Sequence, residues 1–205
     1  MNMTKGIIIL LGIILVLALF FIVVMIIDGK RFHVVRYELV SSKIKKEHVF
    51  VVLSDLHNKE YGKNNEKLLK RIDELNPEAI LIAGDILTAK PQKSYAVALD
   101  LLQKIATKYQ IYYGMGNHET RLFLYPDVYG DMGEHYEQDL NACNIRLMRN
   151  EAVECEDAIR IHGLDMKRDY YKRFKKYPMD ESYLKDTLGE VSADKYEILL
   201  AHNPD

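Results

Sequence analysis

Several polar residues able to bind a metal or move a proton share one placement, because each follows an apolar stretch of the chain within a few positions. They are Asp55, His57, Asp85, Asn117, His118 and His202. Carboxylates and imidazoles seldom belong in a core, so their repeated placement after apolar runs indicates a site rather than packing. Each signal is weak by itself, since Gly-Asp pairs are frequent in turns and strand-terminal histidines are often structural. The prediction depends on their conjunction.

The donor atoms of these residues favour a transition metal. Oxygen ligands would come from Asp55, Asp85 and the Asn117 amide, and nitrogen ligands from His57 and His202. Such a mixed set suits Mn²⁺, Fe or Zn²⁺ better than Mg²⁺ or Ca²⁺, which prefer oxygen ligands.

Apolar runs and amphipathic helices alternate through the middle of the chain and would bring these residues together. The run Val49 to Leu53 is apolar at every position, which predicts a strand buried on both faces. Helices are predicted from Asn64 to Leu75, with Asn76 as the stop, and after Ser94. The strand-helix pair recurs about every 30 residues, which is typical of βαβ units in a parallel sheet. The site residues should therefore meet at one sheet edge.

Shorter elements are predicted around this region. Residues 33–40 alternate loosely and predict a strand, and residues 131–143 predict a helix. The closely spaced runs 145–149, 152–155 and 158–163 predict short antiparallel strands of a second sheet, and a final apolar strand leads into His202.

The first residues predict a membrane anchor. Gly6 to Ile27 contains no charged or strongly polar residue, and as a helix it extends about 33 Å, enough for a hydrocarbon layer of about 30 Å. A cleaved signal peptide is the alternative, but the stretch exceeds a usual h-region and residues 25–29 offer no small-x-small cleavage site. We expect residues 1–29 to form an uncleaved anchor, with a transmembrane helix over 6–27, and residues 30–205 to form one domain.

The charge of the chain argues against one class of partner but does not decide on which side of the membrane the domain lies. The net charge of −2 gives no electrostatic footprint for nucleic acid, and no such partner is expected. Counting Lys5 against Lys30, Arg31 and Arg36 would leave the large domain in the cytoplasm, although long domains often translocate regardless of this count. The two cysteines could pair or remain free.

The ordered series Asp-x-His, Gly-Asp, Gly-Asn-His-Glu and a later strand-terminal His resembles the calcineurin-like metallophosphoesterases over roughly residues 36–205. With its anchor, the chain resembles the membrane-bound bacterial subgroup related to UDP-2,3-diacylglucosamine hydrolases. The resemblance implies an α/β fold, an α-β-β-α sandwich, with a dinuclear metal site at the strand ends. It also implies hydrolysis of a phosphate or pyrophosphate ester by a single-pass cell-membrane protein whose domain lies outside the cytoplasm.

The same resemblance assigns metal ligands to positions of this chain. Asp55 and His57 would bind the first divalent ion, Asp85 would bridge the pair, and Asn117 and His202 would bind the second. Two cations about 4 Å apart need a shared anion, which a bridging carboxylate supplies while a metal-bridging hydroxide becomes the nucleophile.

His118 would stay off the metals and act as the catalytic residue. The resemblance places it facing the substrate, a phosphorylated small molecule or a lipid-linked phosphate. There it could donate a proton to the leaving oxygen or stabilise charge on the phosphoryl group.

One departure from the family pattern concerns the final motif. The family ends with Gly-His-x-His, whose histidines complete both metal shells, and this sequence reaches Asp205 without it. Either the chain is C-terminally incomplete, which is our expectation, or its site cannot hold both metals tightly. The alternative function is a membrane-tethered, non-catalytic binding or scaffold protein on the same fold.

Two further features each allow two interpretations. Glu119 could cap the following turn or orient His118. Residues 167–177 place Tyr170, Phe174 and Tyr177 on one helical face among basic residues. This pattern predicts a surface helix packed through its aromatic rings, or one that rests on anionic lipid or binds a lipid-linked substrate.

Overall fold

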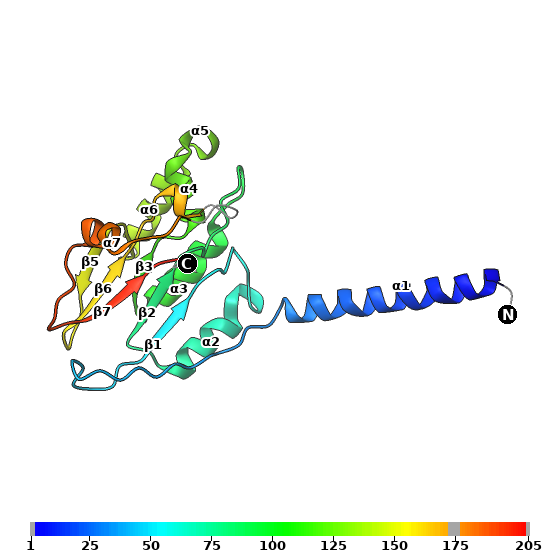
Figure 1. Cartoon of the computed structure of the whole chain (residues 1–205), viewed down its shortest axis with the longest axis horizontal. Coiled ribbons are helices and arrows are strands. Elements are labelled where there is room, and N and C mark those ends of the chain that lie inside the picture. Colours follow the sequence, from blue (N-terminus) through cyan, green and yellow to red (C-terminus); the bar gives the residue numbers. More distant parts are fainter. Residues whose placement is uncertain (1–2, 172–176, 204–205) are drawn as a thin grey trace. The chain divides into compact units, whose positions relative to one another are not determined.

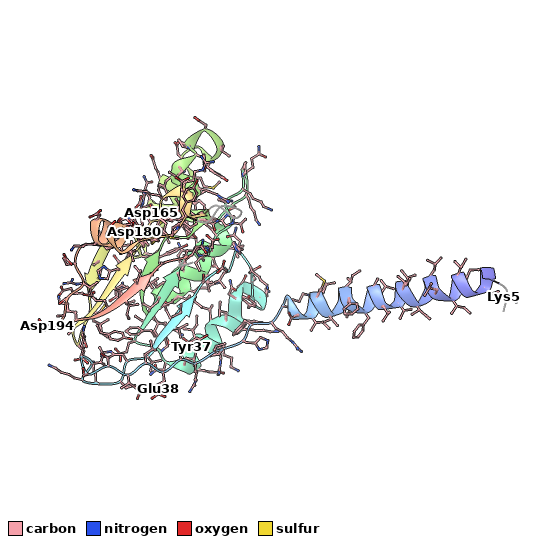
Figure 2. All side chains as sticks on the ribbon, viewed as in Figure 1. Lys5, Tyr37, Glu38, Asp165, Asp180 and Asp194 are labelled. Carbon is pink, nitrogen blue, oxygen red and sulfur yellow. The ribbon has the colours of Figure 1, made fainter. Side chains whose placement is uncertain are left out.

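The computed structural model describes residues 3–171 and 177–203, and the chain divides into two units, residues 1–37 and 38–205. The first unit contains helix α1, Met3–Asp28. Within its stretch Lys5–Asp28, a window of 18 residues has a mean hydropathy of 3.6, and the length and composition of the helix would allow it to cross a membrane. Figure 2 shows apolar side chains along this helix. The predicted apolar helix is therefore present.

A parallel sheet lies at the centre of the second unit, with the strand order β1-β2-β3-β4 among the described residues. Its strands are β1 Phe50–Leu53, β2 Ala79–Ala83, β3 Gln110–Gly114 and β4 Arg146–Met148. The connections contain η1 Lys63–Asn65, α2 Glu66–Leu75, α3 Ala96–Ala106, α4 Asn117–Leu124, α5 Pro126–Tyr129 and α6 Met132–Ala142. The βαβ pattern predicted from the alternating segments is confirmed.

A second sheet follows in the chain and packs against the first. Its strands are β5 Glu151–Glu154, β6 Ile159–Gly163 and β7 Tyr196–Leu200, with η2 Arg168–Tyr171 and α7 Glu181–Leu188 between β6 and β7. β5 is antiparallel to β6, and β7 is parallel to it. The core between the sheets contains Leu81 and Met148 from the first sheet and Ile159, Ile161 and Leu200 from the second. Figure 1 shows β1, β2 and β7 pointing toward the same end of this unit.

Burial explains the wholly apolar sequence of β2 but corrects the prediction for β1. Leu81 enters the core between the sheets, while Ile80 and Ile82 point to the opposite face and are completely buried. In β1 the side chain of Val52 is 61% exposed. The prediction of burial on both faces is wrong there: Phe50 packs against the core between the sheets, but that core does not cover Val52 on the same face of β1, which is an edge strand of the described sheet.

Two predicted strands differ from the structure. Residues 33–40 form no strand, and Tyr37, Leu39 and Val40 are more than three-quarters exposed. A strand needs a neighbour to satisfy its backbone hydrogen bonds, and none pairs with this segment among the described residues. Residues 145–149 contain β4, which joins the first sheet in parallel with β3 instead of the second sheet. Helix α6 returns the chain to the starting end of β3, so β4 runs in the same direction.

The predicted helix boundaries hold to within two residues where capping residues mark them. Asn76 ends α2 in the left-handed conformation, at φ 46°, and Ser94 Oγ accepts the N–H of Ala96 at the start of α3.

Of the predicted basic helix over residues 167–177, the structure describes the 3₁₀ turn η2, and residues 172–176 lie outside the described residues.

Candidate metal centre

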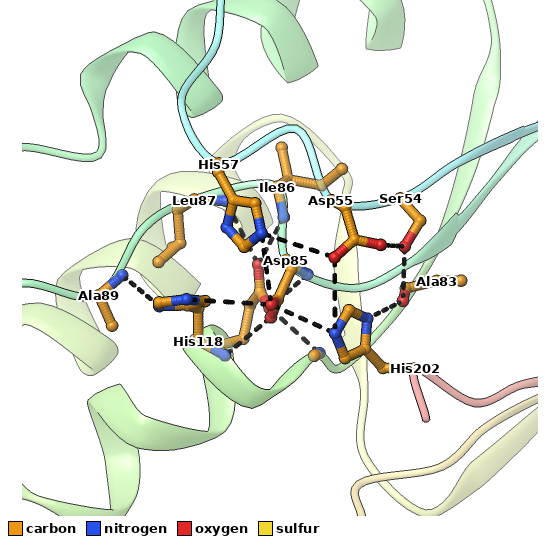
Figure 3. A network of polar contacts seen from close by, with 12 residues as sticks. Ser54, Asp55, His57, Ala83, Asp85, Ile86, Leu87, Ala89, His118 and His202 are labelled. Carbon is orange, nitrogen blue, oxygen red and sulfur yellow. Dashed lines mark hydrogen bonds and ion pairs between the residues drawn. The ribbon is translucent and has the colours of Figure 1, made fainter. Parts of the chain in front are cut away.

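The carboxyl ends of β1, β2, β3 and β7 bring the predicted site residues to one place. In Figure 3 the Asp85 carboxylate lies at the centre of a ring of polar side chains. His202 Nε2 is 3.2 Å from Asp85 Oδ2, and His57 Nε2 and His118 Nε2 are 3.9 and 4.0 Å from the same oxygen. Asp55 Oδ1 lies 3.5 Å from His57 Nε2 and 3.9 Å from His202 Nε2. Donors from separate strands therefore converge on one carboxylate.

Backbone hydrogen bonds continue beyond the ends of β1 and β2 and hold the first two loops together. The N–H of Asp55 donates to Gly84 O at 3.2 Å, and the N–H of His57 donates to Asp85 O at 3.0 Å. Asp55, His57 and Asp85 all adopt positive φ values, of 56°, 50° and 55°. Such conformations are unfavourable for residues with a Cβ and cluster at functional sites, where the surrounding structure maintains them.

The loops after β2 and β3 approach each other so closely that both contain glycine at the contact. Gly84 has φ 86°, and a Cβ there would lie 2.4 Å from the Gly116 nitrogen. A Cβ on Gly116 would lie 2.3 Å from the Asp85 nitrogen. Because real Cβ atoms do not approach backbone this closely, the distance between Asp85 and Asn117 depends on both glycines.

Asp85 is a buried carboxylate held as an anion. Its residue surface is 2% exposed, and Oδ1 accepts the N–H of His118 at 2.8 Å. Burial acts to raise its pKa, but the hydrogen bonds from His202 and the His118 N–H and the nearby imidazole charges together lower the pKa below its usual value.

His202 is oriented by a backbone carbonyl from the neighbouring sheet. Its Nδ1 lies 2.8 Å from Ala83 O, which leaves Nε2 facing Asp85 and Asp55. Burial acts to lower its pKa, but the hydrogen bond to Asp85, the Asp85 charge and the Ala83 carbonyl raise the pKa to about 9. In the metal-free chain the imidazolium therefore neutralises part of the carboxylate charge, a role that a metal cation would also fulfil.

His118 is held in one tautomer by the backbone. The N–H of Ala89 donates to His118 Nδ1 at 2.9 Å, so the proton of the neutral ring lies on Nε2, which faces the cluster. Burial lowers the pKa of His118, and the charges of Arg121, His57 and His202 lower it further against the opposing effect of Asp85. The ring meets His57 edge to face, with centroids 5.0 Å apart.

Asn117 opens helix α4 and points its amide at the same carboxylate. With the amide oriented so that both of its atoms are satisfied, the nitrogen donates to Asp85 Oδ2 and the oxygen accepts the N–H of His118, each over 3.2 Å. Asn117 therefore contacts the Asp85 carboxylate directly, and its amide oxygen is the atom that would serve as a metal ligand.

The donor atoms fit a divalent metal in two overlapping groups. Asp55, Asp85 and His202 offer ligand atoms within 4.8 Å of one another, and so do His57, Asp85 and His118. Asp85 belongs to both groups, as a bridging ligand would. Carboxylate oxygens combined with imidazole nitrogens are the donors that Mn²⁺, Fe and Zn²⁺ accept.

The sequence alone did not identify several supporting groups. Ser54 Oγ donates to Asp55 Oδ2 at 2.7 Å, and the main-chain atoms Ala83 O and Ala89 N orient His202 and His118. Main-chain contacts carry no residue signature, so no sequence pattern could have revealed them. Of the two interpretations of Glu119, the structure shows the capping role, because its carboxylate accepts the N–H of Gly116 at the start of α4.

Comparisons with known proteins agree with this arrangement. The family model described as "Calcineurin-like phosphoesterase" matches residues 48–205. A zebrafish (Danio rerio) protein named "Transmembrane protein with metallophosphoesterase domain" is 25% identical over 162 residues, which cover 75% of this chain and 34% of that protein. The chain thus spans about a third of the length of this relative.

Proposed function

The chain belongs to the calcineurin-like phosphoesterase family, and we propose that it is a membrane-anchored, metal-dependent enzyme that hydrolyses a phosphate or pyrophosphate ester. The observation that carries this proposal is the buried Asp85 carboxylate, surrounded by Asp55, Asn117 and three imidazoles at the strand ends. Fold alone would not support an activity, but a convergent donor set of this chemistry does.

We assign the ligands from the family motif; the geometry supports Asp85 as the shared ligand, although it groups Asp55 with His202 and His57 with His118. Asp55 and His57 would hold one divalent ion, Asn117 and His202 a second, and Asp85 would bridge the pair. Two bound ions would polarise the phosphoryl oxygens and lower the pKa of a water molecule to supply the nucleophile. His202 would have to lose its Nε2 proton to act as a ligand, so metal binding would release a proton.

We assign His118 the stabilisation of charge on the substrate. Because the Ala89 N–H occupies Nδ1, the ring offers one proton, on Nε2, toward the cluster. A neutral imidazole with a lowered pKa is a hydrogen-bond donor more readily than a proton donor. Of the two roles that the family resemblance allows, donation of a hydrogen bond to a phosphoryl oxygen therefore fits the geometry better than protonation of the leaving group.

The apolar helix α1 would hold the domain at a membrane, and this location favours a substrate that is itself found in the membrane. A lipid-linked phosphate or pyrophosphate ester, as in the UDP-2,3-diacylglucosamine hydrolase subgroup, is the substrate class that we propose. We place the domain outside the cytoplasm, in line with the same resemblance.

The test uses the full chain in detergent, stripped of metal and then reloaded with Mn²⁺, Zn²⁺ or Fe²⁺. We expect hydrolysis of an aryl phosphate monoester, a diester or a pyrophosphate ester to depend on the added metal. Asp85→Asn should abolish both metal binding and this hydrolysis, because it removes the shared anion. Asp100→Asn, the same change in an exposed residue of α3 paired with Lys104, is the matched control and should behave as wild type.

Two outcomes would contradict the proposal in different ways. Undiminished metal-dependent hydrolysis by Asp85→Asn would show that the assigned mechanism is wrong. A wild-type chain that binds metal and hydrolyses none of these esters would favour the alternative, a membrane-tethered, non-catalytic binding or scaffold protein.

A further inference from the structure

We infer that Glu119 is a positioning residue that sets the distance between Asp85 and Asn117 without touching a metal, an inference that rests on the proposed function. Glu119 follows the site residues Asn117 and His118 on α4, and its side chain is completely buried. Its carboxylate faces the main chain of the loops after β2 and β3, and the positioning role follows from this contact.

Each oxygen of this carboxylate serves a different part of the site. Oε2 accepts the N–H of Asp85 at 2.8 Å and the N–H of Gly116 at 3.1 Å, so one atom joins the loop after β2 to the loop after β3. Oε1 accepts the N–H of Ile86 at 3.0 Å, the N–H of Leu87 at 3.4 Å and the Tyr113 hydroxyl at 2.7 Å. One carboxylate thus accepts three consecutive main-chain N–H groups of the turn that carries Asp85.

Two other hydrogen bonds join the loops, from the N–H of His118 to Asp85 Oδ1 and from the N–H of Ala89 to His118 Nδ1, but neither satisfies the N–H groups of Asp85, Ile86 or Gly116. The Cβ contacts at Gly84 and Gly116 show that their backbones already touch, and repulsion between two rows of N–H groups would open them. A buried carboxylate whose two oxygens accept several N–H groups offsets that repulsion. Since Asn117 follows Gly116 directly, the Glu119 carboxylate fixes the Asn117 amide relative to the Asp85 carboxylate.

A glutamine cannot replace this residue, although its shape is nearly the same. Its amide nitrogen is a donor and would face either the Asp85 and Gly116 N–H groups or those of Ile86 and Leu87. One set of donors would lose its acceptor in a fully buried position, and the loops would separate.

The test compares Glu119→Gln with Tyr136→Phe in the full chain in detergent. Tyr136 is equally buried, and its hydroxyl contacts that of Tyr113 at 3.1 Å, so its variant removes a neighbouring hydroxyl from the same cluster but leaves the carboxylate in place. We expect Glu119→Gln to weaken Mn²⁺ binding about tenfold or more, as loss of a supporting residue commonly does. Tyr136→Phe should change Mn²⁺ affinity less than about twofold, since it alters no hydrogen bond to the site loops.

Hydrogen exchange of the metal-free chain provides a second readout. In Glu119→Gln the amides of Asp85, Ile86 and Gly116 should exchange faster, while those of Ile80 and Ile82 inside β2 stay protected. Glu119→Asp keeps the charge but retracts it by one methylene, and we expect an intermediate Mn²⁺ affinity. If Glu119→Gln does not fold, the aspartate variant decides: weakened Mn²⁺ binding supports the role and wild-type binding overturns it.

The inference is wrong if Glu119→Gln is less stable to heat yet binds Mn²⁺ like wild type and keeps its loop amides protected. That result would leave Glu119 a purely structural residue. A wild-type chain that binds Mn²⁺ but hydrolyses no phosphoester would instead overturn the proposed function, and the Mn²⁺ affinity of the variant would still decide the role of Glu119.

Discussion

His118 shows how a main-chain contact restricts the chemistry of one side chain. A histidine with both nitrogens free can exchange protons with a substrate through either of them. The Ala89 N–H removes that freedom by occupying Nδ1, and burial with nearby positive charges lowers the pKa. The ring is therefore neutral at neutral pH and presents Nε2–H toward Asp85.

Replacing this ring separates the two roles that are open to it. His118→Asn should retain metal and lower kcat about 100-fold or more, because a positioned donor to the reacting phosphate is lost. If the ring stabilises phosphoryl charge, aryl phosphates with good and poor leaving groups should lose activity equally. Metal content by elemental analysis and kcat across the leaving-group series provide the measurements; a loss confined to poor leaving groups would assign proton donation instead.

Both sheets contribute residues to the site, and a second polar cluster, centred on His48, also joins the two sheets. His48 lies just before β1, with Nδ1 at 2.7 Å from Glu78 Oε2 and Nε2 at 3.2 Å from Asp157 Oδ2. Glu78 precedes β2, and Asp157 lies between β5 and β6. Asp157 Oδ2 also accepts the N–H of Lys45 at 2.8 Å. The His48 side chain is only 6% exposed, so this cluster ties the first sheet to the second.

This cluster makes stability depend on pH. Burial and the charge of Lys46 act to lower the pKa of His48, but its hydrogen bonds to Glu78 and Asp157 raise the pKa above 6.5. A raised pKa in the folded chain means that the stabilisation is fully present below pH 6.5 and is lost as pH rises through the folded pKa. We expect His48→Gln to cost about 1 kcal/mol or more at pH 6 and less at pH 9. Urea unfolding followed by circular dichroism measures this, and an equal cost at both values would contradict it.

At the scale of the whole molecule, the chain combines one apolar helix with one α/β unit. The helix α1 has no charged residue between Lys5 and Asp28. The transmembrane name of the zebrafish relative agrees with membrane anchoring. An anchored enzyme meets its substrate at a membrane surface, which is why we propose a lipid-linked ester.

Removing residues 1–29 should release the chain from membranes. The full chain should remain in the membrane fraction after an alkaline carbonate wash, because transferring so long an apolar helix into water is very unfavourable.

Protease added to intact cells should digest the domain of the full chain if it lies outside the cytoplasm as proposed. A domain that becomes accessible only after the cells are lysed would contradict the proposed orientation.

Local patterns were sufficient to predict much of this molecule. The apolar helix, the βαβ alternation and the ends of α2 were readable because hydrophobic periodicity and capping residues act over a few neighbouring positions. The six candidate site residues were predicted from their repeated placement after apolar strands, because ligands gather at the carboxyl ends of parallel strands, and the structure brings them together.

Only the tertiary structure decided which segments become neighbours. Residues 33–40 have the pattern of a strand but no described partner, Val52 lies on an exposed edge, and β4 pairs in the first sheet. The Ala83 carbonyl that orients His202 and the main-chain N–H groups around Glu119 come from positions far away in the sequence. Residue types and spacing determine which chemistry is available, whereas contacts between distant main-chain atoms depend on packing, and these contacts set the distances and tautomers of the site.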